Sequence, residues 1–287
     1  MQAYRLLAML LRERFSGARL ARRPEPSATM DDESQVAAFH DQGATTLLPV
    51  YHFNALAASR MVPENGTLVD LGSGSAQYLA YLAECRPDMR IVGLELAPRM
   101  VSAGRKMLAQ RGLLNRVELR QGDMTAFAAD FNGAVDLVSS VFSLHHLPDE
   151  CQLVACLGQI RALHQRTGCG VWVFDHVRPR HAATPDLFPA LFTPEAPAAF
   201  NRDSSNSLTA SFAFDELSRH MELAEWPVAE HWLSQWMKLY QVHCFGGRIQ
   251  VQPSGTQGLW RAPVLPEIVR KNWAGLQRLF PDCPKHG

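Results

Sequence analysis

Three carboxylates stand where successive apolar runs of the sequence end. Asp70 closes the run LVD, Glu95 closes IVGLE, and Asp123 follows VELRQG. Two glycines, Gly72 and Gly74, come directly after the first carboxylate. Apolar runs of this length indicate buried strands, and parallel strands bring their carboxyl ends to one edge of a sheet. The sequence therefore predicts that the three acids surround one ligand, beside a loop whose glycines allow close approach of the backbone.

The loop fits a dinucleotide poorly. The dinucleotide fingerprint G-x-G-x-x-G requires a third glycine where this chain has Gln77. Asp70 would also repel a pyrophosphate, and no Lys or Arg occurs between residues 61 and 85. These features disfavour a nicotinamide-dependent oxidoreductase but leave it open, because backbone amides and a helix N-terminus can hold a phosphate without a cation.

A ligand with an ammonium, a carboxylate and a sulfonium suits the same residues better. Asp70 would attract the ammonium, and the glycines would admit the amino-acid arm. Glu95 could accept both hydroxyls of a ribose, as a carboxylate does in bidentate hydrogen bonding. Asp123 could accept from an adenine amino group while Leu96 and Met124 sandwich the ring. S-adenosylmethionine (SAM) has these groups, and it is the expected cofactor.

The motifs resemble those of the class I SAM-dependent methyltransferases, over about residues 50–245. The matching segments are LVDLGSGSA, which contains Ser73, then VGLELAP, QGDM and DLVSSVFSLHHLPD. The last segment is similar to the small-molecule branch that includes the ubiquinone and menaquinone methyltransferases, as is RDSSNSLTASFAFDEL. The family pattern D-x-G-x-G-x-G ends in a glycine where this chain has Ala76. The resemblance implies cofactor contacts from the positions named above and from the backbone near Ser140 and Val141.

The elements that must position these residues alternate from residue 67 onward. Strand-like runs fall at 67–71, 90–94, 117–121, 135–140 and 170–175, and helical patterns fall at 75–84, 98–111, 149–165 and 212–223. Two further β-like runs, at about 227–235 and 237–245, could form an antiparallel pair. Such alternation is typical of an α/β protein with a doubly wound, mostly parallel sheet. The resemblance implies seven strands in this Rossmann-like methyltransferase fold, with the last strand antiparallel.

Three regions are expected. Residues 1–61 would form N-terminal helices and a cap, with helices at about 33–42 and 48–61 and an apolar face of Leu6, Leu7, Leu10 and Leu11 on the first helix. Residues 62–245 would form the methyltransferase core, interrupted at 177–206 by a proline-rich lid insertion that breaks the alternation. Residues 246–287 would form a C-terminal extension, with a helical apolar face at about 266–280.

The acceptor of the methyl group is expected between the cap and the lid insertion. Methyl transfer is an in-line displacement, so an aromatic pocket that holds the acceptor and excludes water can supply much of the catalysis. Tyr51 and Phe142 could form its walls. His145 and His146 follow the fourth strand and could remove a proton from the acceptor, although HHLPD could equally shape a turn. His176 would lie on the same rim.

Two polar residues of the lid insertion could bind the acceptor. Arg202 could clamp a carboxylate or keto group together with Asn206, because a guanidinium binds planar anions bidentately. Their alternative role is to order the loop, with Asn206 or Ser207 as the cap of a helix. The sequence does not indicate whether the acceptor atom is oxygen, nitrogen, carbon or sulfur.

The amino-acid composition indicates which kinds of binding partner to expect. Among 287 residues, 28 Lys and Arg balance 28 Asp and Glu, which favours a small-molecule substrate over nucleic acid. The six cysteines show no C-x-x-C spacing, and Asp175 with His176 is too little for a metal site, so reduced thiols, no metal and a cytoplasmic location are expected. The Arg-rich N-terminal run is too short and too charged for stable membrane insertion. The terminal extensions could pair two copies as a homodimer.

The remaining alternative is a protein that keeps the cofactor fold for a different purpose. It could act as a scaffold or catalyse non-methylating chemistry, such as a cyclisation. Among methyltransferases, the nucleic-acid and protein amide enzymes carry an Asn/Asp-Pro-Pro-aromatic turn after the fourth strand, where this chain reads SVFS. The cytosine-C5 enzymes need a Pro-Cys dipeptide, which does not occur in this sequence.

Overall fold

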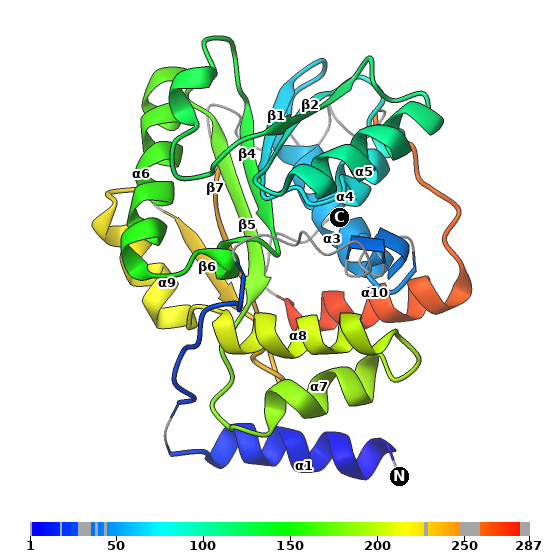
Figure 1. Cartoon of the computed structure of the whole chain (residues 1–287), viewed down its shortest axis with the longest axis vertical. Helices are drawn as coiled ribbons and strands as arrows, with labels where there is room; N and C mark the ends of the chain where they lie inside the picture. Colours follow the sequence, from blue (N-terminus) through cyan, green and yellow to red (C-terminus); the bar gives the residue numbers. More distant parts are fainter. Residues whose placement is uncertain are drawn as a thin grey trace.

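The computed structural model describes residues 2–17, 19–27, 36–37, 40–42, 45–226, 229–246 and 259–281. These residues contain one seven-stranded sheet with the order β3-β2-β1-β4-β5-β7-β6 (Figure 1). Its strands are β1 (Thr67–Leu71), β2 (Arg90–Glu95), β3 (Val117–Gln121), β4 (Leu137–Val141), β5 (Gly170–His176), β6 (Glu230–Leu233) and β7 (Tyr240–Phe245). Strand β7 is antiparallel to both of its neighbours, and the pairs among β1 to β5 are parallel. The expected doubly wound sheet with an antiparallel last strand is confirmed.

Helices cover both faces of the sheet and make a three-layer structure (Figure 1). One face carries α3 (Leu48–Met61), α4 (Gln77–Cys85), α5 (Pro98–Gln110) and α10 (Glu267–Leu279), and the other carries α6 (Glu150–Thr167) and α9 (Phe214–Leu223). Successive side chains of a strand point to opposite faces, so Leu68 packs in the first layer and Val69 in the second. This double burial explains why the central strands are nearly all apolar.

The proline-rich segment expected as a lid insertion contains two helices, α7 (Thr184–Phe192) and α8 (Ala198–Ala210). The alternative of a helix that starts at Asn206 or Ser207 is wrong, because both residues lie inside α8. The sequence NRDSSNS is rich in poor helix formers, and packing against α7 outweighs that preference. In Figure 1, α8, α7 and α1 (Gln2–Phe15) are stacked one below another beyond the arrowhead of β5.

Helix α1 docks on α7, but with a different face from the one expected. Met9 is fully buried, and Leu6 packs beside it against the cluster that contains Phe188. Leu7 and Leu11 are 54% and 46% exposed, so the expected four-leucine face is wrong for these two. The carboxylate of Glu13 accepts the backbone N–H groups of residues 180 and 181 at 2.8 and 3.0 Å, which ties the helix to the start of the lid segment.

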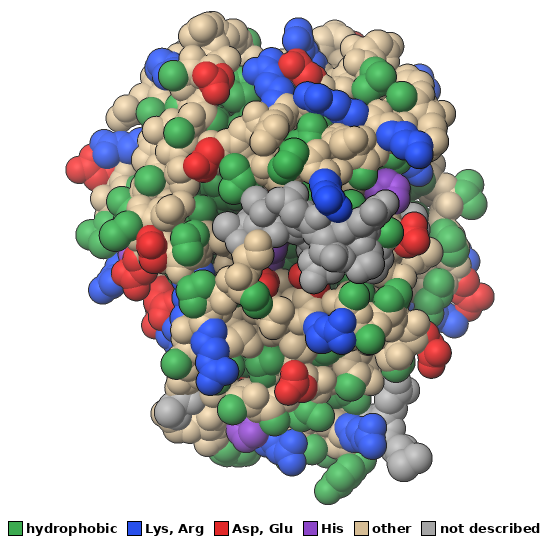
Figure 2. Space-filling model, viewed as in Figure 1, with side chains coloured by type: hydrophobic (Ala, Val, Ile, Leu, Met, Phe, Trp, Pro, Cys, Tyr) green, Lys and Arg blue, Asp and Glu red, His purple; other side chains and the backbone are tan. Residues whose placement is uncertain are grey.

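Some expectations fall outside the described residues. They are residues 33–35, 38 and 39 of the cap helix expected at 33–42, Cys283, and residues 247–258 and 282–287 of the C-terminal extension. The five cysteines within the described ranges are free thiols. Of the helices that can be described, none is both long enough and apolar enough to cross a bilayer. On the face shown in Figure 2, basic and acidic side chains are interspersed.

Candidate active site

A first cavity, called here the loop cavity, opens at the carboxyl ends of β1, β2 and β4 beside the glycine loop. Most of the residues predicted to contact the cofactor line it, namely Asp70, Gly72, Ser73, Gly74, Glu95, Leu96, Asp123, Met124 and Val141. Ser140 does not line it, because its side chain is buried against Ser143. Ser143 lines the cavity in its place, with its hydroxyl donating to the Leu71 carbonyl at 2.6 Å.

The glycine loop is shaped by left-handed backbone. Gly72 has φ +68°, and a Cβ at this position would lie 2.4 Å from the Cβ of Ser143. Ala76, which stands where the family pattern has a glycine, has φ +60° and precedes the first residue of α4. A left-handed alanine is disfavoured by about 1–2 kcal/mol. Ala76 therefore adopts the left-handed backbone conformation that favours glycine, the residue that the family pattern has at this position.

The carboxylate of Glu95 is fixed by the loop that it faces. Its Oε2 accepts the N–H of Gly74 at 2.8 Å, and its Oε1 accepts the N–H of Ala97 at 2.8 Å. Asp123, on the far side of the cavity, is exposed, and its Oδ1 accepts the N–H and the hydroxyl of Thr125, each at 2.7 Å. Both acids are therefore held in one orientation before any ligand binds.

Asp70 is the acid at the inner end of the loop cavity. It is 2% exposed, and its Oδ1 accepts the hydroxyl of Ser139 at 2.6 Å. Burial raises the pKa of Asp70 to about 8; the hydrogen bond from Ser139 opposes this shift, and the charge of Glu95 adds to it. Without a cation nearby, Asp70 is therefore mostly protonated at neutral pH, and a bound ammonium would favour the carboxylate.

A second cavity, called here the histidine cavity, adjoins the first and has a volume of about 840 Å³. Its walls come from α1, the start of α3, α7, α8, α10 and the ends of β4 and β5, so the cap and lid segments both contribute as expected. Phe142 and His146 line both cavities. Tyr51, expected in the acceptor wall, lines the loop cavity instead.

Phe142 forms the wall between the two cavities in a strained conformation, with φ +56°. Its ring stacks on that of His176 with centroids 4.4 Å apart and planes 16° from parallel. His176 lines the histidine cavity, and burial, together with the charge of His145, lowers its pKa to about 3. Within the described residues, its Nδ1 is buried without a hydrogen-bond partner. A neutral imidazole with one unpaired nitrogen is suited to hydrogen-bond a ligand.

His145 is held by Asp175 at the end of β5. The Oδ1 of Asp175 lies 2.6 Å from the Nδ1 of His145, and its Oδ2 accepts the backbone N–H of the same residue at 3.1 Å. Burial alone would lower the pKa of His145, but the charge of Asp175 and this hydrogen bond outweigh it and hold the pKa above its usual value. Because Nδ1 is engaged, Nε2 is the nitrogen left for the histidine cavity.

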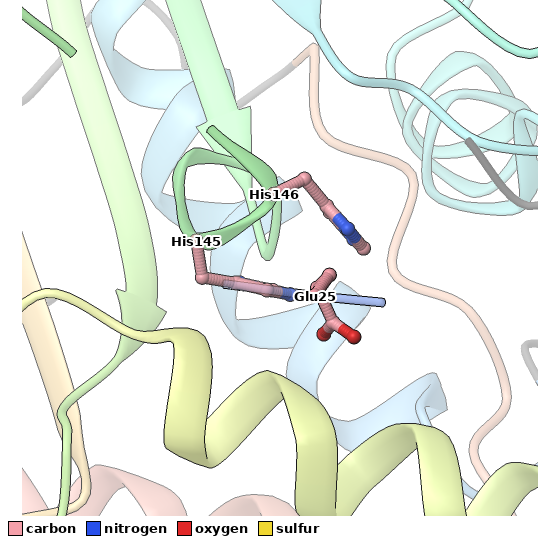
Figure 3. A group of neighbouring side chains, drawn as sticks. All are labelled: Glu25, His145 and His146. Carbon is pink, nitrogen blue, oxygen red and sulfur yellow. The ribbon is translucent and has the colours of Figure 1, made fainter. Parts of the chain in front are cut away.

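Glu25, which was not predicted from the sequence, lies beside the two histidines. Arg22 holds the segment that leads to Glu25 against the turn after β4, where its guanidinium donates to the carbonyls of residues 145, 147 and 148. The same guanidinium also donates to the carbonyl of residue 210, at the end of α8. Three residues after Arg22, the Oε1 of Glu25 accepts the hydroxyl of Ser207 at 2.9 Å. Figure 3 shows Glu25 next to the imidazoles of His145 and His146. One potential ligand atom from each of the three lies within 4.8 Å of the others, a group that could hold a metal ion.

The two polar residues expected to clamp the acceptor face elsewhere. Arg202 and Asn206 are exposed on α8, and neither lines either cavity. One position further along the chain in each case, Asp203 and Ser207 line the histidine cavity. A helix turns about 100° per residue, so expecting a loop here placed the wrong side chains in the site.

Part of the chain is similar to known methyltransferases. Residues 68–168 match a family model described as a methyltransferase domain. The chain is 30% identical over 159 residues to a probable chloroplastic tocopherol O-methyltransferase of Oryza sativa subsp. japonica, covering 52% of this chain and 41% of that protein. It is 28% identical over 124 residues to indolepyruvate C-methyltransferase of Streptomyces griseus, covering 43% and 37%. The chain thus spans less than half the length of these curated relatives.

Solved structures show the same fold. The plantazolicin methyltransferase BamL, in complex with a triazolic desmethylPZN analog and SAH, aligns with a TM-score of 0.54 at 14% identity, over 96% of this chain and 89% of that one. SAH is what remains of SAM after methyl transfer. The match of residues 68–168, the named methyltransferase relatives and the seven-stranded fold agree. Residues 68–168 therefore carry a methyltransferase domain, in a chain whose fold is that of solved S-adenosylmethionine-dependent methyltransferases.

Proposed function

We propose that the protein transfers a methyl group from SAM to a small-molecule acceptor, with SAM in the loop cavity and the acceptor in the histidine cavity. The observation that carries this proposal is the shared wall: Phe142 and His146 line both cavities. An in-line displacement needs donor and acceptor to meet at one boundary, and this is where the two cavities meet.

In the loop cavity, each charged group has a matching group on SAM. Asp70 binds the ammonium, Glu95 accepts from the ribose hydroxyls, and Asp123 accepts from the adenine amino group. Glu95 is held by backbone amides and Asp123 by Thr125, so their orientation costs little to fix on binding. Tyr51 and Val141, at the same cavity, face the methionine arm.

In the histidine cavity, an apolar acceptor fits walls in which apolar and aromatic side chains, most often Leu and Phe, outnumber polar ones. His145, His146 and His176 supply the polar contacts, and His145 and His146 act on the reacting group of the acceptor, assisting removal of its proton where it has one. The relatives are named for transfer to oxygen and to carbon, so the lining of this cavity, rather than membership of the class, selects the acceptor atom.

Calorimetry with SAM and SAH tests the cofactor half. We expect one site per chain with a dissociation constant in the micromolar range, lost in Asp70→Ala. Glu118→Gln is the matched control, because Glu118 lies on β3, outside the loop cavity. A folded wild-type protein that gives no heat at millimolar SAH would refute the proposal. A screen of metabolite pools with methyl-labelled SAM would then identify the acceptor.

The prediction of a homodimer stays open, and α1 supports it. Tyr4, Leu7, Leu11 and Phe15 form an exposed row at helical spacing, 79%, 54%, 46% and 74% exposed. Such a row is suited to pack against a second copy. Sedimentation equilibrium of the wild type and of Leu7→Glu/Leu11→Glu would measure whether the row holds two chains together.

A further inference from the structure

We propose that Glu25, His145 and His146 bind one divalent first-row transition-metal ion in the histidine cavity. Each side chain offers one ligand atom, and these atoms lie within 4.8 Å of one another (Figure 3). Two imidazoles and one carboxylate are a common ligand set for Zn²⁺, Fe²⁺ and similar ions, whereas Mg²⁺ and Ca²⁺ prefer oxygen alone. Binding of the ion does not depend on the proposed function; only its role in catalysis rests on that function.

The spacing is close to what an ion requires. Bonds to imidazole nitrogen and carboxylate oxygen are about 2.0–2.2 Å, so two ligand atoms on one ion lie at most about 4.4 Å apart. The three atoms are at most 4.8 Å apart, so each pair needs to close by no more than about 1.5 Å to reach the roughly 3.4 Å that separates two ligands of a tetrahedral ion. Glu25 can supply this movement because, among the described residues, its carboxylate accepts one hydroxyl, that of Ser207, at 2.9 Å.

The ligands have the supporting contacts that metal ligands have. Metal-binding histidines generally donate their second N–H to a carboxylate, which fixes the ring and its tautomer. His145 is bound to Asp175 in this way, through Nδ1 at 2.6 Å, with Nε2 left for the ion. Arg22 fixes the chain on the other side, because its guanidinium binds the carbonyls of residues 145 and 147 and so holds the Glu25 segment beside the two imidazoles.

The local charge also favours a cation. Asp203 lines the histidine cavity, and the charge of His145 acts on both Glu25 and Asp203. The donors of the neighbouring Arg22 are directed at backbone carbonyls rather than at these acids. With Asp175 bound to His145 on the other side, carboxyl groups surround that imidazole, and a divalent ion would balance their negative charge.

Three protein ligands leave coordination positions open to the cavity, as in catalytic rather than structural metal sites. A hydroxyl or enol oxygen of the acceptor could bind there and lose its proton to water more readily, because the ion lowers the pKa of a bound oxygen. The oxygen lone pair then forms the O–CH₃ bond while the S–CH₃ bond of SAM breaks, and that electron pair stays on sulfur, leaving neutral SAH. This step makes an oxygen nucleophile the acceptor class that fits the site.

A titration of the full chain with Co²⁺, after treatment with a chelator and dialysis, tests the proposal. We expect one ion per chain, with visible absorption bands of a nitrogen- and oxygen-bound cobalt and displacement by Zn²⁺. Glu25→Gln and His146→Gln should each weaken binding by about 100-fold or more, since even loss of a supporting contact costs 10–100-fold. His176→Gln, in the same cavity but outside the ligand set, should bind Co²⁺ within about twofold of the wild type.

Two measurements keep the result interpretable. Circular dichroism and thermal unfolding check that each variant folds, and calorimetry with SAH checks the loop cavity separately. If SAH binds but Co²⁺ does not, or if Glu25→Gln and His146→Gln bind Co²⁺ as well as the wild type, the metal site is wrong and the proposed methyl transfer stands. If SAH fails to bind, the proposed function fails, whatever the outcome with cobalt.

Discussion

Asp175 and His145 are joined twice, once through the ring and once through the backbone. The Oδ1 of Asp175 lies 2.6 Å from the ring Nδ1, the Oδ2 accepts the backbone N–H at 3.1 Å, and both side chains are 3% exposed. The last residues of β5 thus set the position of the turn after β4 and the direction of the imidazole on it.

Replacing Asp175 with Asn should disturb this pair. The amide would present a donor to one of the two N–H groups, leaving a buried polar group unpaired at a cost of about 1–3 kcal/mol in unfolding free energy. We also expect Co²⁺ affinity to fall by about 10–100-fold, while SAH affinity stays within about twofold. Urea denaturation and the two titrations measure these effects. A variant with unchanged cobalt affinity would show that Asp175 has only a structural role.

Replacing Asp70 with Asn should stabilise the protein relative to the wild type, by an amount that grows as pH rises. The unfolded state ionises this acid near pH 4, whereas the folded state keeps its proton up to about pH 8. The contribution of Asp70 to the unfolding free energy of the wild type therefore falls between about pH 4 and 8 and is constant above pH 8. Asp70→Asn lacks this acid, so its unfolding free energy does not show that fall. Urea denaturation at pH 5, 6.5, 8 and 9 should show a gap between the two proteins that widens up to pH 8.

The raised pKa of Asp70 leads us to expect that a proton is released when SAM or SAH binds. At pH 7 a group with a pKa of about 8 is mostly protonated, and the ammonium of the ligand would convert it to the carboxylate. Calorimetry in two buffers with different ionisation enthalpies should detect close to one proton released per ligand at pH 7, and much less at pH 9. Equal heats in the two buffers at pH 7 would contradict contact between Asp70 and the ammonium.

Replacing Glu95 with Gln should weaken SAH binding by about 10–100-fold. The amide cannot accept both the Gly74 and the Ala97 N–H groups while still accepting from the ribose, and hydrogen bonds to charged groups contribute about 1.5–3 kcal/mol each. Glu95→Ala should weaken binding further. Calorimetry of the two variants beside Glu118→Gln gives the comparison, and unchanged affinity in Glu95→Gln would remove Glu95 from the cofactor site.

Replacing Arg22 with Lys should loosen the N-terminal segment although the charge is kept. The guanidinium donates to four carbonyls and lies 4.0 Å from the centroid of the Phe212 ring, and a lysine ammonium cannot reproduce that fork. We expect a loss of about 1–3 kcal/mol in unfolding free energy and faster proteolysis within residues 19–27. Arg23→Lys is the control, because Arg23 is exposed. Equal protease resistance of the two variants would contradict this role for Arg22.

The meeting of the three acids at the loop cavity could be predicted because its signals are local. Asp70, Glu95 and Asp123 follow strands whose apolar runs are unmistakable, and the fold brings those ends together. The glycine pair marks the loop directly, since a side chain at Gly72 would collide with Ser143. Of the two residues expected at the end of β4, Val141 lines the cavity and Ser140 does not, and Ser143 lines it from the turn that follows the strand.

The acceptor half could not be predicted in the same way, because its residues meet through tertiary packing. Glu25 lies 120 positions before His145, and the polar segment around it gives no periodic signal. Asp203 was missed because RDSSNS favours a loop by intrinsic preference, whereas α8 is a helix stabilised by its contacts. The direction of each side chain on α8 follows only once the helix is known.

The segment around Glu25 has a consequence for how such proteins diversify. The matched domain, residues 68–168, contains Asp70, Glu95 and Asp123, but Glu25, α7, α8 and α10 all lie outside it. Substitutions in these outer segments can therefore change much of the lining of the histidine cavity without altering the three acids of the loop cavity. A chimera that grafts the outer segments onto a relative's domain would carry over that part of the lining, whereas Phe142, His145 and His146 would come from the inner domain.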